Sequence, residues 1–258
     1  MNDVKLPLVS IITHALNTED TIEKTILSIF SQTYKNIEYI IVDGASTDNT
    51  VQIIKKYDKQ ISGWISEKDK GPIDAWSKAY KMTKGNIIFS LSADDWIQND
   101  VIQIIVDTFK KNKKSGFVYG DMVMVHKNKE ILVNGNVDYK ANIKRGEPSF
   151  NYPSVSYKRE VFENFGVPSL KYYRHNDYEF LVRLYMNNVE SSYTNKFKVY
   201  RLPGGLGESG GLKSLFEIIS INRKYKLPFM SHFIKSSINL SKIFLLSSLK
   251  KLIGKNKK

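Results

Sequence analysis

The sequence contains no cysteine among its 258 residues and no long uninterrupted hydrophobic run. Without cysteine, neither a disulfide framework nor a thiolate metal site is possible. The N-terminus shows no basic segment followed by a long apolar one, so we expect no secretory signal. No stretch of about 18 apolar residues predicts a bilayer-spanning helix. These absences favour a cytoplasmic protein whose core is built from the 41% of residues that are hydrophobic.

Histidine is also scarce. The four histidines show no metal-ligand spacing, and we interpret most of them as structural: His14, His126, His175 and His232. A glycine-rich stretch at Gly204–Gly211 matches both GxGxxG and GxSxG, but the partner residues that either motif requires are missing downstream. We therefore interpret that stretch as a mobile loop over a site.

The net charge of +13 is unevenly distributed along the chain. Residues 213–258 hold eleven Lys and Arg against the single acid Glu217, which accounts for ten of the thirteen net positive charges. Apolar residues recur among these lysines, which predicts a basic amphipathic helical tail on an anionic membrane surface. The alternative is a helix that packs on the rest of the protein. No recognised nucleic-acid-binding module accompanies the charge, so we expect no nucleic acid partner.

The first half of the chain alternates strand and helix patterns. Four apolar runs predict short buried strands: Val9–Thr13, Ile37–Asp43, Trp64–Ser66 and Ile87–Leu91. Helical patterns lie between them, the first beginning at Thr18 or Asp20 and the second behind the capping cluster Ser46–Asp48. Repeated units of this kind predict an α/β fold with a mostly parallel sheet.

The pattern changes after about residue 115. The segments GFVYGDMVMV and KEILVNG predict a hairpin, HNDYEFLVRLYMNN predicts a helix, and KFKVYRL predicts a strand. We interpret this part as a mixed extension that covers one side of the sheet.

Acidic residues follow every predicted strand after the first. Asp43 ends the second strand, Glu67 and Asp69 follow the third, and Asp94 and Asp95 follow the fourth. Ligands bind outside the carboxyl ends of strands in open α/β sheets. The sequence therefore predicts a cation or a set of ligand hydroxyls at this edge.

Most of these acids also have a structural interpretation. One aspartate of the pair Asp94–Asp95 would suffice as a helix cap, so we favour a divalent cation held by carboxylates and substrate phosphates. Asp43 has no expected capping role and suits a nucleobase edge or a ribose hydroxyl. For Asp48 a capping role is favoured. Asp69 lies in a charged loop and gains weight only from its position beside the other acids.

Two acids start the predicted helix HNDYEFLVRL. Asp177 shares the apolar face of this helix, and it is equally consistent with a cap and with a general base pointing into a cleft. Glu179 has Arg183 four residues on, which predicts an exposed ion pair.

Four segments occur together in a specific order and spacing: LVSIITHALN, NIEYIIVDGASTDNT, ISEKDKGPIDAWSKA and IIFSLSADDW. Together they resemble family 2 glycosyltransferases of the Rossmann-like GT-A fold, most closely the bacterial enzymes of colanic-acid and O-antigen assembly. The resemblance is strong over residues 7–125 and weaker to about residue 190. It implies a glycosyltransferase domain over residues 1–212, with a nucleotide-sugar half to about 115 and an acceptor half from about 116, followed by the tail at 213–258.

The resemblance also implies roles for individual residues. Asp43 would hold the nucleobase, Asp69 the nucleoside, Asp95 a Mg²⁺ or Mn²⁺ ion, and Asp177 the proton of the attacking hydroxyl. The expected contacts of the nucleotide-diphosphate sugar, with a UDP-sugar as the expected donor, are Thr13, Ala15, Asn17, Asp43, Asp69 and Asp94. The expected reaction is an inverting transfer to a lipid-linked saccharide at the inner face of the cell membrane, in surface polysaccharide synthesis.

Three positions depart from the family pattern. Ala15-Leu16 replaces the common Thr-Tyr, Trp76-Ser77 replaces Arg-Asn, and Ala93 replaces the first acid of the metal motif. Two alternative functions stay open. A sugar-nucleotide nucleotidyltransferase would carry a Gly-rich, basic first loop, which THALNTED lacks, and a non-catalytic nucleotide-sugar binding module would fit the departures.

Overall fold

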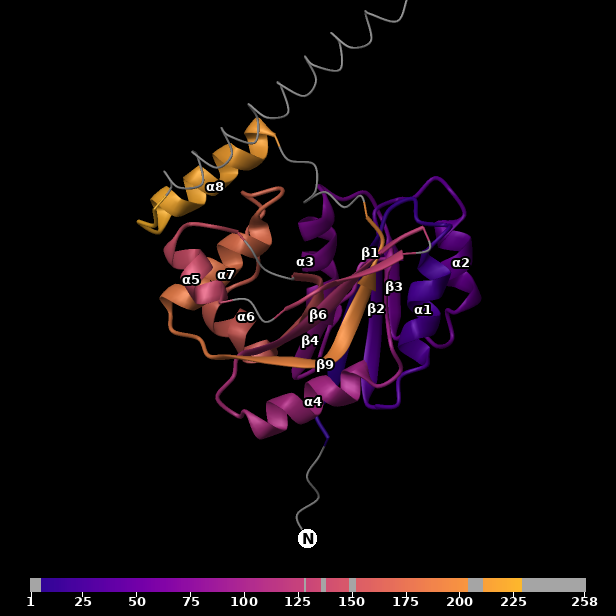
Figure 1. Cartoon of the computed structure of the whole chain (residues 1–258). Helices are drawn as coiled ribbons and strands as arrows, with labels where there is room; N and C mark the ends of the chain where they lie inside the picture. Colours follow the sequence, from indigo (N-terminus) through magenta and orange to yellow (C-terminus); the bar gives the residue numbers. More distant parts are fainter. Residues whose placement is uncertain (1–5, 128, 136–137, 149–151, 204–210, 229–258) are drawn as a thin grey trace, which may run out of the picture.

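The computed structural model describes residues 6–127, 129–135, 138–148, 152–203 and 211–228. Within these residues the strands form one nine-stranded sheet in the order β3-β2-β1-β4-β8-β6-β9-β5, with β7 paired to β6. Helices lie on both faces of this sheet (Figure 1). The predicted α/β architecture is confirmed.

The amino-terminal half supplies four strands that pair in parallel, with a helix after each of the first three. They are β1 (Val9–Ala15), α1 (Ile22–Phe30), β2 (Ile37–Asp43), α2 (Thr50–Lys56), β3 (Gly63–Ser66), α3 (Pro72–Met82) and β4 (Ile87–Ser90). Alternate residues of these strands enter opposite layers. Ile41 packs in the layer of α1 and α2, and Ile40 packs in the layer of α3. Burial on both faces explains the continuous apolar runs in the sequence.

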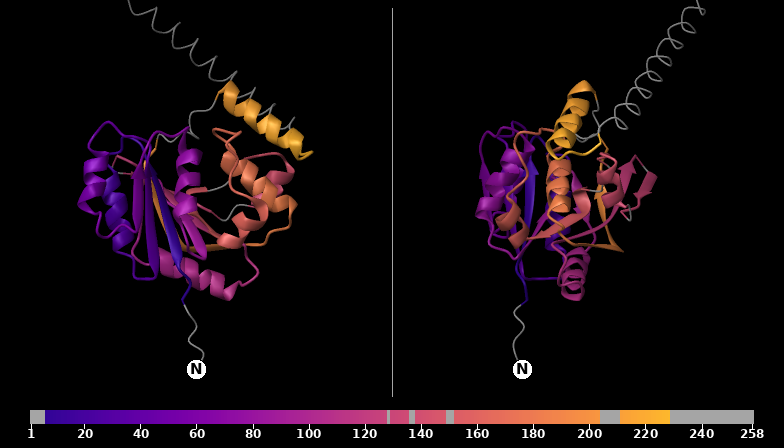
Figure 2. Two further views of the ribbon diagram at one scale, coloured as in Figure 1. Left: turned by 180° about the vertical axis from the view of Figure 1, so that it is seen from behind. Right: turned by 90° about the vertical axis from the view of Figure 1, so that its left-hand side faces the viewer.

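The second half forms the mixed extension. Its elements are β5 (Asp95–Ile97), α4 (Val101–Lys111), β6 (Phe117–His126), β7 (Lys129–Val133), α5 (Tyr139–Lys144), the 3₁₀ helix η1 (Tyr152–Ser154), β8 (Val155–Lys158), α6 (Arg159–Phe165), α7 (Asn176–Met186), β9 (Ser191–Arg201) and α8 (Leu212–Lys224). The predicted hairpin is the antiparallel pair β6–β7. Strand β8 pairs antiparallel with both β4 and β6, and so joins the two halves in one sheet. Figure 2 shows α5, α6 and α7 grouped on the side of the sheet that faces α8.

Both predicted helix starts are early. The helix α1 begins after Thr21, because the carbonyl of Thr18 accepts the N–H groups of Thr21 and Ile22 in a preceding turn. Asn49 is the residue before α2, and Asp48 instead accepts the N–H groups of Thr50 and Glu19, each at 3.0 Å. Asp48 therefore joins the start of α2 to the loop after β1.

The described part of the predicted tail packs on the rest of the protein. Ile218 and Ile221 of α8 are buried in the same layer as Tyr178 and Phe180 of α7. The proposed boundary at residue 212 thus falls at the start of a helix that shares the core. Residues 229–258 and the glycine-rich stretch 204–210 lie outside the described residues. Across the described ranges, no helix combines the length and apolar character that crossing a bilayer requires.

Candidate active site

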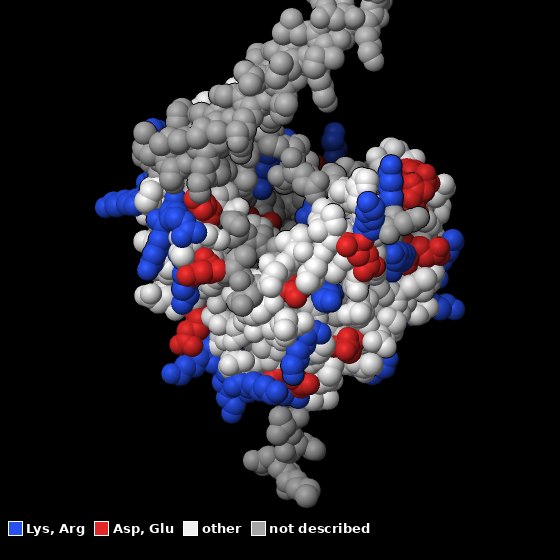
Figure 3. Space-filling view, in the orientation of Figure 1, with Lys and Arg blue, Asp and Glu red and all other residues white. Residues whose placement is uncertain are grey.

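The carboxyl ends of the first three strands lie in register at one edge of the sheet. Ala15 at the end of β1 pairs with Asp43 at the end of β2, and Asp43 pairs with Ser66 at the end of β3. The N–H of Gly44 donates to the carbonyl of Ala15 at 2.8 Å and joins the loops after β1 and β2. In the space-filling view a hollow opens in the upper part of the molecule, with acidic and basic atoms visible inside it (Figure 3).

Asp43 is fully buried, and its carboxylate holds the local backbone. It accepts the N–H of Ser46 at 3.0 Å, the hydroxyl of Ser66 at 2.6 Å and the hydroxyl of Ser46. We expected no capping role for Asp43, and these bonds give it a different structural role, because they fasten the loop after β2 to the end of β3. A carboxylate has about four acceptor positions. The contact with the nucleobase stays a prediction and would use the one acceptor position that is left.

The predicted contacts on β1 and its following loop differ in accessibility. Thr13 is fully buried and its hydroxyl accepts a hydrogen bond from the Tyr39 hydroxyl at 3.1 Å, so its side chain is not open to a ligand. Ala15 is 4% exposed. Asn17 has a φ of +51°, and its side-chain oxygen accepts the N–H of Thr47 at 2.8 Å. Asn17 therefore shapes the loop after β2.

Asp69 lies against the loop that follows Asp43. One carboxylate oxygen accepts the N–H of Gly71 at 2.7 Å, and the other lies 2.5 Å from where a Cβ would stand at Gly44. Glycine at position 44 is what allows Asp69 this close approach. Glu67, in contrast, directs its carboxylate to Lys78 of α3 at 2.8 Å.

The aspartate pair follows β4, and Asp95 is the first residue of the short strand β5. The hydroxyl of Thr25 in α1 lies 3.0 Å from the carbonyl of Ala93 and 2.7 Å from that of Asp95, which fixes the backbone here. Asp94 is partly exposed and Asp95 is only 2% exposed. Burial, together with the charge of Asp94, raises the pKa of Asp95 from 3.8 to about 8, while the positive charge of Arg201 opposes the shift.

The carboxylate of Asp95 fits a divalent cation. Its Oδ1 is buried and has no hydrogen-bond donor within the described part of the chain. A buried acceptor without a donor is costly, and a cation would supply the missing partner. The described residues contain no cluster of three His, Asp or Glu side chains that would enclose a metal alone. Phosphates and water would therefore complete the coordination, as is usual for Mg²⁺.

Asp177 is the second residue of α7, and its side chain is exposed to solvent. The protein packed around the carboxyl group raises its pKa from 3.8 to about 6, and the charge of Arg201 opposes this shift. A carboxylate with this pKa is ionised at neutral pH and is still a better proton acceptor than an ordinary aspartate. The properties of Asp177 suit a general base.

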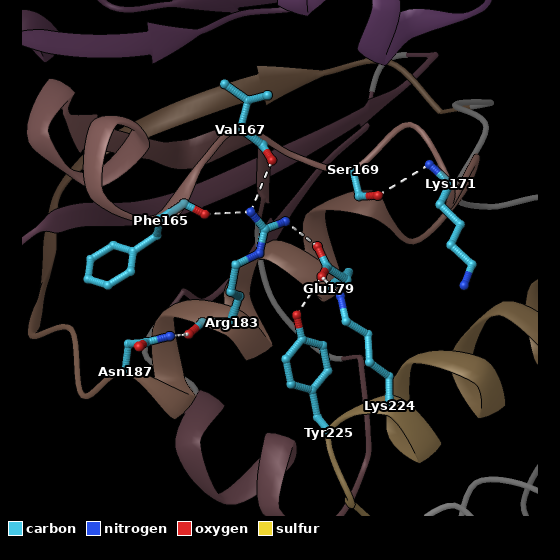
Figure 4. Close-up of polar contacts among 9 residues, drawn as sticks. All are labelled: Phe165, Val167, Ser169, Lys171, Glu179, Arg183, Asn187, Lys224 and Tyr225. Atoms are coloured by element: carbon cyan, nitrogen blue, oxygen red, sulfur yellow. Dashed lines mark hydrogen bonds and ion pairs between the residues drawn. The ribbon is translucent and has the colours of Figure 1, made fainter.

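The prediction of an exposed ion pair for Glu179 is wrong. Glu179 is fully buried and pairs with Arg183, with Lys224 at 2.8 Å and with the Tyr225 hydroxyl at 2.5 Å (Figure 4). The four-residue spacing within α7 correctly predicted that Arg183 pairs with Glu179. Burial arises because the end of α8 packs over this face of α7, which a helical pattern alone does not reveal.

Sequence reasoning missed Arg201. This residue ends β9 and pairs in register with Asp95 of β5, and its charge acts on both Asp95 and Asp177. Its Nε is buried without a hydrogen-bond partner among the described residues. The pairing of β5 with β9 joins residues about a hundred positions apart, so no local pattern reveals it. The only signal in the sequence was an arginine at the end of a predicted strand.

The structural role expected for His14 stays a prediction. This residue lies near the end of β1, and burial lowers its pKa while the charges of Asp94 and Asp69 act in the opposite sense. The charges of two acids of the candidate site, Asp94 and Asp69, therefore act on His14.

Trp76 explains one departure from the family pattern. It is 7% exposed, stacks on Tyr80 with ring centroids 5.4 Å apart, and packs against Phe162. The side chain that replaces the usual arginine thus belongs to the core and supplies no charge to the site.

Comparison with known proteins decides the family. The model of glycosyl transferase family 2 matches residues 10–166, which is more than half of the chain. The chain belongs to glycosyl transferase family 2. This family-2 enzyme is 31% identical over 215 residues to UDP-Glc:alpha-D-GlcNAc-diphosphoundecaprenol beta-1,3-glucosyltransferase WfaP of Escherichia coli, a match that covers 81% of this chain and 83% of WfaP. It is 36% identical over 123 residues to WfgD, of the same description and species, covering 47% of this chain and 48% of WfgD.

Solved structures support the same fold. Staphylococcus aureus TarS in complex with UDP-GlcNAc superposes with a TM-score of 0.66 at 19% identity, covering 84% of this chain and 65% of that one. The Pyrobaculum calidifontis mannosyltransferase PcManGT, with GDP-Man and Mn²⁺, gives a TM-score of 0.63 at 18% identity, with 86% and 64% covered. The family-2 chain thus spans just under two thirds of each solved chain. The predicted GT-A fold is confirmed.

Proposed function

We propose that this family-2 glycosyltransferase moves a sugar from a UDP-sugar to a lipid-linked saccharide, with inversion at the anomeric carbon and with a divalent cation. The observation that carries the proposal is that the positive charge of one arginine, Arg201, acts on both Asp95 and Asp177, which supports a common site for these two carboxylates. The similarity to WfaP, a glucosyltransferase from UDP-Glc to a diphosphoundecaprenol-linked GlcNAc, supports this donor and acceptor class.

The residues of the site have different roles in binding the donor and the metal ion. Asp43 and Asp69, from the loops after β2 and β3, bind the base and ribose of the donor, and Asp94 with Arg201 faces the diphosphate. Asp95 holds Mg²⁺ or Mn²⁺. When bound, such an ion would neutralise the charge that develops on the departing diphosphate.

Asp177 performs the proton transfer in this proposal. Its carboxylate accepts the proton of the acceptor hydroxyl while that oxygen attacks the anomeric carbon from the face opposite the diphosphate. The new glycosidic bond forms as the bond to the diphosphate breaks, so the configuration inverts. The exposed position of Asp177 leaves room for the acceptor.

The direct test is a calorimetric titration of UDP-, GDP- and dTDP-sugars, first with Mn²⁺ and then with EDTA. The proposal expects one nucleotide class to bind in a metal-dependent way, followed by product formation with an alkyl-diphosphate-linked GlcNAc acceptor. Binding without any product would favour the binding-module alternative. If no nucleotide sugar binds, the proposal is wrong.

Replacing Arg201 with methionine should weaken donor binding roughly tenfold to a hundredfold, because a hydrogen bond to a charged group contributes about 1.5–3 kcal/mol. It should also move the pH midpoint of transfer upward, since the arginine charge opposes the raised pKa of Asp177. Donor titration and a pH–rate profile check both effects. Lys196→Met is the control, because Lys196 is an exposed residue of the same strand. Equal donor affinity in Arg201→Met and the wild type would remove Arg201 from the site.

For the tail we propose peripheral contact with an anionic membrane at the inner face of the cell membrane. Leu212 and Phe216 of α8 are 62% and 63% exposed and lie one turn apart, which gives the start of the tail an apolar strip. Lys250→Glu with Lys251→Glu should reduce flotation with anionic vesicles roughly tenfold or more, because each basic residue near such a surface contributes about 1 kcal/mol. The matched control is Lys113→Glu with Lys114→Glu. The proposal would be contradicted if the two variants floated equally with anionic vesicles, or if neither distinguished anionic from neutral vesicles.

A further inference from the structure

The backbone in front of α7 is held by a carboxylate from another helix. Glu217 of α8 accepts the N–H groups of Tyr173 at 3.1 Å, Arg174 at 2.9 Å and His175 at 3.0 Å. His175 is the residue before the helix, and its own side chain makes no capping bond. Three successive N–H groups directed at one anion form a nest of the kind that binds anions in many proteins.

This contact bears on the role of Asp177, which lies two residues beyond the nest. An acid in the first turn of a helix is attracted to the backbone N–H groups at that end. Because Glu217 already occupies the nest, Asp177 does not need to fill it. Within the described residues its carboxylate accepts no hydrogen bond and stays exposed.

Further contacts fix α8 against α7. The Ser214 hydroxyl lies 2.6 Å from Nε2 of His175, and the Tyr178 hydroxyl donates to Asn222 at 2.8 Å. At the far end, Lys224 donates to the buried Glu179 at 2.8 Å (Figure 4). The position of Glu217 is therefore set by the whole length of α8, and the nest is held from outside α7.

We propose that Glu217 is a positioning residue for the general base: by occupying the nest at residues 173–175, it keeps the Asp177 carboxylate free and directed at the acceptor. This inference rests on the proposed function, in which Asp177 takes the proton of the acceptor. The same carboxylate makes α8, the first helix of the basic tail, part of the catalytic framework.

The charged and titratable groups that act on Asp177 come from other elements. They are Arg201 of β9, Tyr152 of η1 and Tyr157 of β8. A substitution at position 217 changes none of them. A shift in the pH dependence of transfer would therefore report a new environment for Asp177 itself.

The test compares Glu217→Ala, Glu217→Gln and Lys224→Met in the full chain, with UDP-glucose, Mn²⁺ and an alkyl-diphosphate-linked GlcNAc. In Glu217→Ala we expect a kcat about tenfold lower, with a KM for UDP-glucose within about twofold of the wild type. The pH midpoint should fall, because N–H groups that bind the Asp177 carboxylate favour its charged form. Glu217→Gln, which keeps an acceptor oxygen, should recover part of kcat. Lys224→Met should lower stability without moving the midpoint.

Amide hydrogen exchange gives a readout that does not depend on activity. The N–H groups of residues 173–175 should exchange faster in Glu217→Ala than in Lys224→Met. An unchanged kcat and midpoint in Glu217→Ala, with an active wild type, would overturn this inference alone, as would unchanged exchange. A wild-type chain that forms no product would overturn the proposed function, and this inference with it.

Discussion

Replacing Asp177 with asparagine is expected to reduce transfer from UDP-glucose by roughly a hundredfold to ten-thousandfold, the usual contribution of a positioned general base. Asparagine keeps the size of the side chain but cannot accept the proton of the acceptor hydroxyl. Donor binding should be retained, because Asp43, Asp69 and Asp95 are unchanged. The measurement is product formation under saturating donor, together with calorimetry of UDP-glucose in the presence of Mn²⁺.

The pH dependence of the wild type sharpens this expectation. The protein packed around the Asp177 carboxyl group raises its pKa to about 6, and the base acts only when deprotonated. The logarithm of kcat should therefore rise with a slope of one below about pH 6 and level off above it. The residual rate of Asp177→Asn should lack that bend. Glu160→Gln is a suitable control, since Glu160 is an exposed acid of α6 paired with Lys158. A full transfer rate in Asp177→Asn would place the base elsewhere.

The parallel half of the fold could be predicted because its signals are local. Strands β1, β2 and β4 are largely buried on both faces, so an apolar run such as Ile37–Asp43 predicts a strand there. The convergence of Asp43 and Asp69 also follows from the sequence, because parallel strands place their carboxyl ends at one edge. Helix starts were predicted only to within a few residues, since Thr18 and Asp48 accept the N–H groups of the first helical residues, Ile22 and Thr50, from positions that precede the helices.

The rest of the site depends on long-range pairing. Strand β5 has only three residues and begins with an acid, so no periodicity reveals it. Its pairing with β9 brings Arg201 to Asp95, and the packing of α8 buries Glu179 and brings Glu217 to the start of α7. These contacts follow from how the second half folds over the sheet, and no residue spacing encodes them.

Replacing Asp95 with asparagine should abolish the metal-dependent part of donor binding. In the wild type, Mn²⁺ should strengthen the binding of UDP-glucose, and EDTA should remove that gain. Among the described residues no donor reaches the buried Oδ1 of Asp95, and a neutral amide there loses the charge that attracts the cation. In Asp95→Asn the titrations with Mn²⁺ and with EDTA should therefore coincide.

The same substitution should stabilise the protein at alkaline pH when no metal is present. The pKa of Asp95 is about 8 in the folded protein and 3.8 in the unfolded chain, so between these values the folded state holds a proton that the unfolded state has released. The free energy of unfolding should thus fall as pH rises from about 4 to 8, by up to roughly 1.4 kcal/mol per pH unit from this group. Asparagine removes that loss.

Urea unfolding in EDTA at pH 5 and pH 8 measures this effect. Asp95→Asn should gain on the wild type at pH 8 and gain much less at pH 5. Asp107→Asn is the control, because Asp107 is a half-exposed acid of α4 that lies 3.8 Å from Lys110 at the surface. Its free energy of unfolding should match that of the wild type at both pH values. A stability gain joined to a loss of Mn²⁺ response would show that the chain keeps a destabilising carboxylate at this position for its cation. Parallel pH curves for Asp95→Asn and the wild type, with the Mn²⁺ response intact, would rule out Asp95 as the metal ligand.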